Sequence, residues 1–478
     1  MVKLTIDLLK KEYGDFQTPV ELSKKMISIL DELNFKPYLI IEPTCGIGNI
    51  LLDAHKHFLP KKTIGVEINK EYCNRLSDKI GGQNIRLYNL NIFTAIDVIK
   101  KETKSDDNFL FIGNPPWVTN SELSALESGN MPQKSNIKNV RGIEALTGKS
   151  NFDICEYIIS KLVLEFVDKN AVFAFLCKTS VARNVLKFLW NNGVLYKESF
   201  IYPIDAKKYF DASADACFFI FEKTRKNNIK ECKVFDSIET KKFINKLGLY
   251  KGKMVADVDN PQYYGYMGKC EYNWRNGIKH DCSKVMEFDI KLGKLINGYG
   301  ETVNIENDLL YPLLKSSDIA NGTQEVRKMV LITQKQIGEN TDYIKNKYPK
   351  TWEYLNAHID DFNKRKSVVY KNKPLFSVFS VGEYTFEPYK IAISSLYKKL
   401  KFKLVLPIDN KPVIVDDTCN YISCKSLDEA NKIYSLLNNK KAKDFFNSII
   451  FWDSKRPITT EVLNSFNFGK KDMQMKMF

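Results

Sequence analysis

The apolar residues in the first half of the chain gather in short continuous runs, separated by stretches with a helical period. Seven runs predict strands, at residues 39–41, 63–66, 85–88, 109–113, 171–176, 199–202 and 216–221. Uninterrupted apolar runs of this length are typical of strands covered on both faces, as in a parallel sheet. Residues 20–33 repeat apolar positions at helical spacing. The pattern therefore predicts an α/β domain.

The alternation of strands and helices fades after residue 223, and we place a domain boundary near residue 235. Residues 236–478 are rich in Tyr, Lys and Asn and hold only short β-like runs, such as 404–406 and 413–415. A chain of 478 residues is also long enough to make two domains the natural expectation. We expect one domain over 1–235 and a mixed α+β domain over 236–478.

Charge favours a polyanionic partner. The chain carries 72 Lys and Arg against 57 Asp and Glu, a net charge of +15. Such an excess suits nucleic acid, although a solvated basic surface would give the same count. No apolar stretch is long enough to span a membrane and the N-terminus lacks an apolar signal segment, so we expect a cytoplasmic protein without a membrane partner.

The cysteines give no sign of a metal site. Ten are present without any Cys-x-x-Cys pair, and several lie in apolar runs, as reduced core residues do. Cys270, His280 and Cys282 match no common zinc spacing. We therefore expect no metal.

The tetrapeptide Asn114-Pro115-Pro116-Trp117 follows the predicted strand at 109–113. Two prolines cannot continue a strand, so the chain leaves the sheet at its carboxyl edge, where α/β proteins bind ligands. The side-chain oxygen of Asn114 and the carbonyl of Pro115 could accept both N–H groups of an exocyclic base amine and stabilise charge that develops on it. Trp117 offers a face for a flipped base. The alternative is a rigid turn beside a core aromatic residue.

The first predicted strand leads through Glu42 into a turn with Gly46 and Gly48, which allow positive φ and close backbone approach. The third glycine of a dinucleotide fingerprint would fall at Leu51, so that motif is not matched. Glu42 would repel a phosphate and suits an ammonium group instead. Glu67 ends the second strand, where nucleoside-binding folds hold the ribose diol.

One further residue, Asn91, belongs to the same edge. Asn91 follows the third strand and could hydrogen-bond an adenine edge, with Ile92 or Phe93 packed on the ring. Thr18 and Pro19 predict a helix start, with Thr18 as N-cap and Pro19 at the first helical position.

Basic residues suited to DNA phosphates lie in two regions. Residues 118–150 have little apolar periodicity, and a loop of this length is usually functional or disordered. It carries Lys134, Lys138, Arg141 and Lys149. In the C-terminal half we select Lys364, Arg365, Lys366, Lys398 and Lys399, although any single cluster could be a solvated face.

In their order, residues 16–19, 42–48, 67 and 114–117 resemble the S-adenosylmethionine-dependent DNA N6-adenine methyltransferases of bacterial restriction–modification systems. The arrangement is similar to the gamma subclass, in which cofactor motifs precede Asn-Pro-Pro-aromatic and a target-recognition domain follows. The likeness covers roughly residues 13–225, and in the C-terminal half mainly 387–390 to 416–418.

The resemblance implies a seven-stranded class I methyltransferase (Rossmann-like) domain with one antiparallel strand over 1–235, and a target-recognition domain over 236–478. It implies methyl transfer from S-adenosyl-L-methionine to the N6 amine of an adenine flipped out of double-stranded DNA. The catalytic residues implied are Asn114, Pro115, Trp117 and Phe210. The cofactor contacts implied are Phe16, Thr18, Pro19, Glu42, Pro43, Cys45, Gly46, Gly48, Glu67, Ile68, Asn91, Ile92 and Asn114. Where the family usually has Asp, this chain has Asn91, whose amide oxygen can still accept a bond from the cofactor's adenine amine, so we expect weaker cofactor discrimination.

Several alternatives stay open. The same fold could methylate cytosine N4, an RNA base or a protein glutamine, although the last would not need a large basic second domain. An inert methyltransferase domain would leave a sequence-specific DNA-binding protein. We find no Asp and Glu-x-Lys cluster in a strand context, which favours a separate cognate restriction endonuclease over cleavage by this chain. Whether the protein is a monomer or a dimer is open.

Overall fold

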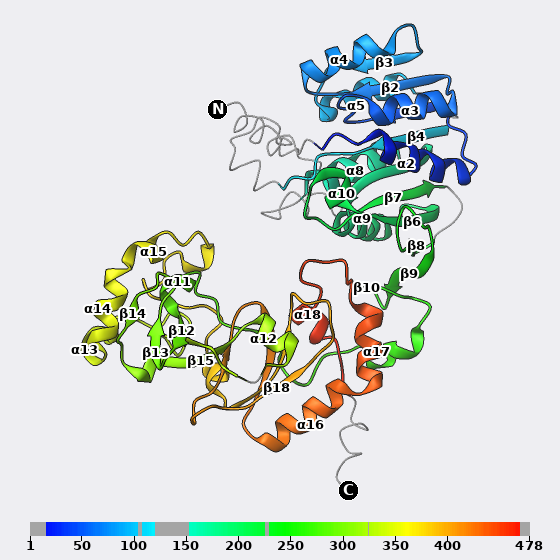
Figure 1. Cartoon of the computed structure of the whole chain (residues 1–478). Coiled ribbons are helices and arrows are strands. Elements are labelled where there is room, and N and C mark those ends of the chain that lie inside the picture. The colour runs from blue at the N-terminus through cyan, green and yellow to red at the C-terminus, as the bar shows by residue number, and fades with distance from the viewer. Residues whose placement is uncertain (1–15, 104–107, 120–152, 225–228, 324, 469–478) are drawn as a thin grey trace. The chain divides into compact units, whose positions relative to one another are not determined.

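Figure 1 shows the computed structural model, which describes residues 16–103, 108–119, 153–224, 229–323 and 325–468. The chain divides into two compact units, Met1–Asp259 and Asn260–Phe478. The sequence pattern placed the boundary near residue 235. The division lies further along the chain, because strands of the first unit's sheet continue past that residue.

The first unit is built on a ten-stranded sheet with the order β10-β9-β8-β6-β7-β5-β4-β1-β2-β3. All seven predicted strands are present: β1 (Leu39–Glu42), β2 (Lys62–Val66), β3 (Ile85–Tyr88), β4 (Asn108–Gly113), β5 (Asn170–Lys178), β6 (Tyr196–Ile204) and β7 (Ala216–Lys223). Strands β1 to β5 pair in parallel, and β7 is antiparallel to both β5 and β6. The expected class I methyltransferase fold is confirmed, with β7 as the one antiparallel strand among these seven, but the sheet has ten strands rather than the expected seven.

The strands that the sequence analysis missed are β8 (Glu231–Phe235), β9 (Phe243–Tyr250) and β10 (Lys253–Val255). They extend the sheet beyond β6, with β8 parallel to β6 and the last two antiparallel to their neighbours. Strand β9 is largely exposed or half-buried, so it lacks the continuous apolar run by which the inner strands were recognised.

Helices cover both faces of the sheet (Figure 1). They are α2 (Val20–Glu32), α3 (Asn49–Phe58), α4 (Lys70–Ile80), α5 (Ile92–Lys101), α8 (Ile154–Glu165), α9 (Thr179–Asn191) and α10 (Ala206–Phe210). On one face Leu110 belongs to the same buried cluster as Leu22 and Met26 of α2. On the other face Phe111, Phe173 and Phe221 stack across three neighbouring strands, with ring centroids 4.8 Å apart at each step. This double cover explains why β4 and β5 read as continuous apolar runs.

The start of α2 differs in detail from the prediction. The helix begins at Val20 as expected, but its N-cap is Pro19 and no side chain caps it. The Thr18 hydroxyl is used elsewhere, in the candidate site.

The second unit contains a six-stranded sheet, β14-β13-β12-β16-β15-β19, and a four-stranded sheet, β11-β20-β17-β18. The strands are β11 (Arg275–Asn276), β12 (Glu287–Lys291), β13 (Lys294–Ile296), β14 (Thr302–Val303), β15 (Leu310–Leu314), β16 (Lys328–Leu331), β17 (Tyr389–Ser394), β18 (Lys403–Val405), β19 (Ile414–Val415) and β20 (Cys419–Cys424). The predicted β-like runs at 404–406 and 413–415 fall on β18 and β19. The expected mixed α+β architecture is present.

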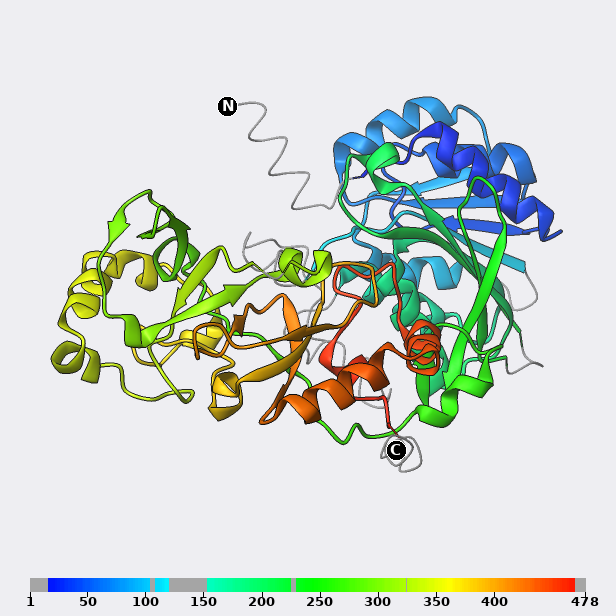
Figure 2. The same ribbon diagram turned by 60° about the horizontal axis from the view of Figure 1, so that its bottom comes forward.

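Helices of the second unit are mostly short: α11 (Ser283–Met286), α12 (Ser316–Asn321), α13 (Tyr343–Lys347), α14 (Pro349–Ala357), α15 (Ile359–Asn363), α16 (Leu427–Asn438), α17 (Lys440–Ile449) and α18 (Thr460–Leu463). Four 3₁₀ turns are described as well: η1 (Pro261–Tyr266), η2 (Asn307–Leu309), η3 (Val368–Tyr370) and η4 (Glu383–Phe386). Helix α16 packs against the strands of the four-stranded sheet (Figure 2).

The two ends of the second unit meet. Gly268 N–H donates to the Ser465 carbonyl at 2.8 Å, and Cys270 N–H donates to the Asn464 carbonyl at 2.9 Å. The rings of Tyr266 and Phe466 stack with centroids 5.6 Å apart. The chain therefore enters this unit beside its last described residues.

Among the described residues, no helix is both long and apolar enough to cross a membrane. The same residues contain no cluster of three His, Cys, Asp or Glu side chains that could hold a metal ion.

Candidate active site

A cleft opens at the carboxyl ends of β1, β2, β3 and β4, where the topology brings four strand ends to one edge. It encloses about 1000 Å³ of space, which includes open solvent. Eleven of the predicted cofactor residues line it: Phe16, Thr18, Glu42, Pro43, Cys45, Gly46, Glu67, Ile68, Asn91, Ile92 and Asn114. Pro19 and Gly48, also predicted, are not among its lining residues.

The glycine turn is held from two sides. Gly46 N–H donates to Glu67 Oε2 at 2.7 Å, and Ile47 N–H donates to Gln17 Oε1 at 3.0 Å. Gly46 has φ +52°, and a Cβ there would come within 2.4 Å of Gln17 Oε1. Gln17 was not singled out from the sequence, although it lies between Phe16 and Thr18, which were. The turn thus needs glycine both for its backbone conformation and for the packing of Gln17.

Gly48 has the positive φ that was expected of it, and its lack of a side chain also serves helix packing. It has φ +83° at the start of α3, and a Cβ would lie 2.3 Å from Leu76 Cδ1. The missing side chain lets α3 approach α4 closely, so Gly48 shapes the floor of the turn.

Two carboxylates face each other across this turn. The second oxygen of Glu67, Oε1, accepts from Asn69 N–H at 2.7 Å, so both of its oxygens are bound by backbone amides. Glu42 is 2% exposed, and its Oε2 has no hydrogen-bond partner among the described residues. Burial, with the nearby charge of Glu67, raises the pKa of Glu42 well above its usual range. A buried carboxyl oxygen that lacks a partner and lines a cleft is suited to a cationic ligand.

The side chain of Asn114 has a fixed orientation. Its Nδ2 donates to the Phe16 carbonyl at 2.8 Å and to Thr18 Oγ1 at 3.2 Å. A backbone carbonyl can only accept, so turning the amide over would set two oxygens against each other. The consequence is that Oδ1 stands buried in the cleft without a partner among the described residues.

Three aromatic rings from distant parts of the chain gather beside Asn114. The ring centroids are 5.4 Å apart for Phe16 and Trp117, 5.8 Å for Phe16 and Phe210, and 5.3 Å for Trp117 and Phe210. Trp117 is 6% exposed, and its indole N–H donates to the Leu176 carbonyl at 3.4 Å. The structure thus brings both predicted base-contacting aromatics together, packed on one another rather than lining the cleft.

Asn91 is the N-cap of α5, and its Oδ1 accepts from Phe93 N–H at 2.9 Å. The oxygen that was expected to accept a bond from a ligand is therefore already used to begin a helix. Nothing in the sequence alone distinguishes the two orientations of this amide.

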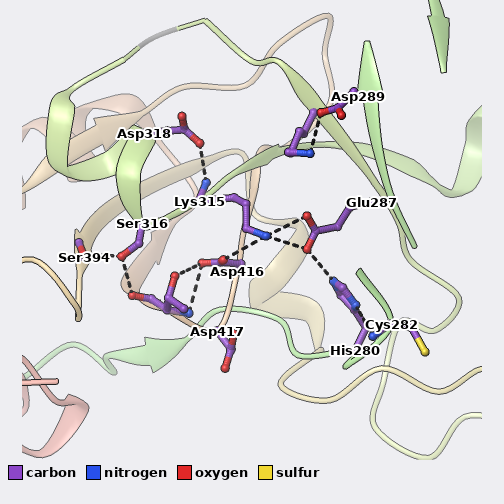
Figure 3. Close-up of polar contacts among 12 residues, drawn as sticks. His280, Cys282, Glu287, Asp289, Lys315, Ser316, Asp318, Ser394, Asp416 and Asp417 are labelled. Atoms are coloured by element: carbon purple, nitrogen blue, oxygen red, sulfur yellow. Dashed lines mark hydrogen bonds and ion pairs between the residues drawn. The ribbon is translucent and has the colours of Figure 1, made fainter. Parts of the chain in front are cut away.

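The second unit has a separate cavity of about 1140 Å³, with a polar network in its wall (Figure 3). Lys315 Nζ donates to both oxygens of Glu287 at 2.9 and 2.8 Å, and His280 Nε2 lies 3.4 Å from Oε1. Although burial opposes it, the hydrogen bonds from His280 and Lys315 and the charge of Lys315 lower the pKa of Glu287 to about 2. The His280 proton lies on Nε2, because Nδ1 accepts from Cys282 N–H at 3.2 Å. The network ties β12 to the start of α12.

The basic residues selected for DNA contact fall into three groups. Lys364, Lys366, Lys398 and Lys399 are exposed on the second unit. Arg365 differs from its neighbours: its guanidinium donates to the Ser377 carbonyl at 2.7 Å and lies 3.9 Å from the Tyr370 ring centroid. Lys134, Lys138, Arg141 and Lys149 lie outside the described residues. The hydrogen bond and ring contact of Arg365 thus stabilise the fold of the second unit.

Comparison with known proteins gives consistent results. The N-6 DNA methylase family model matches residues 6–246. The Type II methyltransferase M.NspV of Nostoc sp. is 42% identical over 470 residues, covering 97% of each chain. Modification methylase CviBIII of Paramecium bursaria Chlorella virus NC1A is 24% identical over 176 residues, 37% of this chain and 40% of the relative.

One solved structure shares the fold over most of the chain. It is the type IIL restriction–modification enzyme MmeI in complex with DNA, with a TM-score of 0.55 and 14% identity. The match covers 96% of this chain and 66% of MmeI.

Proposed function

This chain belongs to the N-6 DNA methylase family, and from that premise we propose that it transfers the methyl group of S-adenosyl-L-methionine to the N6 amine of an adenine in double-stranded DNA. It is a DNA methyltransferase of a restriction–modification system. Beyond the family assignment, we propose the target base, the cofactor and the role of each residue.

The observation that carries the proposal is the orphaned Oδ1 of Asn114. A buried acceptor without a partner costs free energy, about 1–3 kcal/mol in typical cases, so it is retained where a ligand supplies the missing donor. An exocyclic amine is such a donor. The Asn114 amide and the adjacent Pro115 carbonyl would hold both of its N–H groups.

The cleft fits the proposed cofactor group by group. Three of its lining residues, Glu42, Thr44 and Asn114, each have a buried oxygen without a hydrogen-bond partner in the described part of the chain. Glu42 would receive the ammonium of the methionine moiety, and this attraction opposes the burial that raises its pKa. Glu67 can accept from ribose hydroxyls while it holds Gly46, because each carboxylate oxygen has two lone pairs.

When bound, S-adenosyl-L-methionine supplies a methyl group on a positively charged sulfur, already activated for transfer. The protein must therefore make the amine nitrogen a better nucleophile, since its lone pair is delocalised into the ring. Two fixed acceptors draw the amine toward tetrahedral geometry, and their dipoles stabilise the positive charge that develops on nitrogen. The proton then leaves to solvent, which requires no strong base.

We assign the stacking of the flipped base to Trp117 and Phe210. Both rings lie within 6 Å of Phe16, whose carbonyl orients Asn114. Base–aromatic stacking is worth about 1–3 kcal/mol per base, enough to offset much of the cost of unstacking. Because the two rings now pack on each other, a base would have to displace part of that contact.

The second unit would bind and read the DNA. Its exposed lysines Lys364, Lys366, Lys398 and Lys399 suit phosphate contacts, which position a protein without reading sequence. A separate restriction endonuclease acting on the same site completes the proposed system.

The test is mass analysis of nucleosides from unmethylated DNA incubated with the protein and S-adenosyl-L-methionine. We expect N6-methyladenine from the wild type and from Asn191→Ala, a control change at an exposed amide of α9, and a loss of at least about 100-fold in rate for Asn114→Ala. N4-methylcytosine would keep the mechanism and refute the target base. Near-normal turnover by Asn114→Ala would refute its assignment.

A further inference from the structure

Asn91 lies between β3 and α5, and in the sheet order β4-β1-β2-β3 this is the opposite end of the cleft from Asn114, which follows β4. Around it the lining is apolar, formed by Leu90, Ile92 and Ile158 among others. Under the proposed function, on which this inference rests, Glu67 at the end of β2 holds the ribose, so the purine extends toward β3. Asn91 is then the polar side chain that meets the edge of the purine.

The cap determines which end of the Asn91 amide faces the ligand. Oδ1 accepts from Phe93 N–H at 2.9 Å, with Asn91 in the extended conformation that N-caps adopt, φ −66° and ψ 135°. Turning the amide over would place its NH₂ group against the Phe93 N–H and leave that helix donor unpaired. Nδ2 forms no hydrogen bond with the described part of the chain. It is therefore the group available to a ligand.

The geometry points to Asn91 as a hydrogen-bond donor to a ring nitrogen of the cofactor's purine. A purine edge offers ring nitrogens as acceptors and the 6-amino group as a donor. A carboxylate at this N-cap could use one oxygen for the helix and the other to accept from the amino group. With an amide the second atom is a donor. Because the proposal directs Nδ2, rather than the oxygen that caps α5, at the purine, the cleft does not read the 6-amino group.

The test is equilibrium binding, which does not depend on methyl transfer. The probes are S-adenosyl-L-homocysteine and its analogue with hydrogen in place of the 6-amino group. Removing that group deletes one donor and leaves the ring nitrogens in place. The proteins are the wild type and Asn91→Asp, and since Asp is as good an N-cap as Asn, α5 is retained.

We expect the wild type to bind both probes with dissociation constants that agree within about twofold. We expect Asn91→Asp to bind S-adenosyl-L-homocysteine at least about tenfold more tightly than the analogue, because a charged acceptor now meets the amino group.

A wild-type preference of about fivefold or more for the amino compound would overturn the inference, since a neutral acceptor produces that much. Equal binding of both probes by Asn91→Asp would also overturn it, because residue 91 would then not contact this edge. If the wild type binds neither probe, the cofactor assignment itself fails. That result is distinct from the other two.

Discussion

The hydroxyl of Thr18 provides a direct test of how Asn114 is held. Asn114 Nδ2 has two acceptors, the Phe16 carbonyl at 2.8 Å and Thr18 Oγ1 at 3.2 Å. Thr18→Val removes the second acceptor while keeping the shape of a side chain that is 5% exposed. Thr18→Ser keeps the hydroxyl and is the matched control.

The expected loss follows from one neutral hydrogen bond. Such a bond contributes about 1 kcal/mol, which corresponds to about a fivefold fall in kcat if the amide must be oriented at the transition state. The Phe16 carbonyl still holds the amide, so the loss stays well below that of Asn114→Ala. The Thr18 backbone carbonyl, which accepts from Asn49 Nδ2 at 2.8 Å, is retained in both variants.

The assay is single-turnover methylation of a saturating DNA duplex with labelled cofactor, with cofactor binding measured separately. A double-mutant cycle isolates the effect. In an Asn114→Ala background the amide that Thr18 orients is absent, so Thr18→Val should leave the methylation rate unchanged. Equal rates for Thr18→Val and Thr18→Ser would refute the reasoning. So would an unchanged penalty in the Asn114→Ala background.

Three further predictions follow from charged side chains. Burial raises the pKa of Glu42 and a cationic ligand would lower it, so cofactor binding should be accompanied by proton release; calorimetry in two buffers of different ionisation enthalpy should detect it, and Glu42→Gln should abolish it. Burial lowers the pKa of Lys390 to about 7, so between pH 7 and its ordinary 10.5 the unfolded chain holds the extra proton and stability rises with pH. The slope is at most about 1.4 kcal/mol per pH unit, and Lys390→Met should remove it in denaturant unfolding at pH 7 and 9. Arg365→Gln should lower the free energy of unfolding by about 2 kcal/mol. The double variant Lys364→Ala and Lys366→Ala should leave the free energy of unfolding unchanged and reduce the slope of log DNA affinity against log salt concentration by about 2. The reverse pattern would contradict both predictions.

The sequence was most informative about the inner strands of the first unit. Phe109 to Ile112 are fully buried on both faces, so the uninterrupted apolar run predicted the strand correctly. Strand β9 lies between β8 and β10, and most of its residues are exposed or half-buried, so its pattern gave no such signal. It was missed because its pairing with neighbouring strands, rather than burial, defines it.

Site residues could be predicted wherever topology alone brings them together. Glu42, Glu67, Asn91 and Asn114 each end a parallel strand and therefore share one edge. What could not be predicted was the direction of individual polar groups. Thr18 was expected to cap α2, yet its hydroxyl binds a side chain 96 residues away. Arg365 was selected as a DNA contact, and its guanidinium donates to carbonyls within its own unit.

The paired ends of the second unit have a genetic consequence. Gly268 and Cys270 bond to residues 464 and 465, so the unit is closed on itself and is joined to the first unit through residues 256–260, between β10 and η1. Its coding sequence is one uninterrupted block downstream of the catalytic part. A single crossover in the gene near those codons would pass on the entire second unit with its core intact. Under the proposed function, that unit carries the recognition of DNA. Sequence preference could thus be inherited from one parent and chemistry from another.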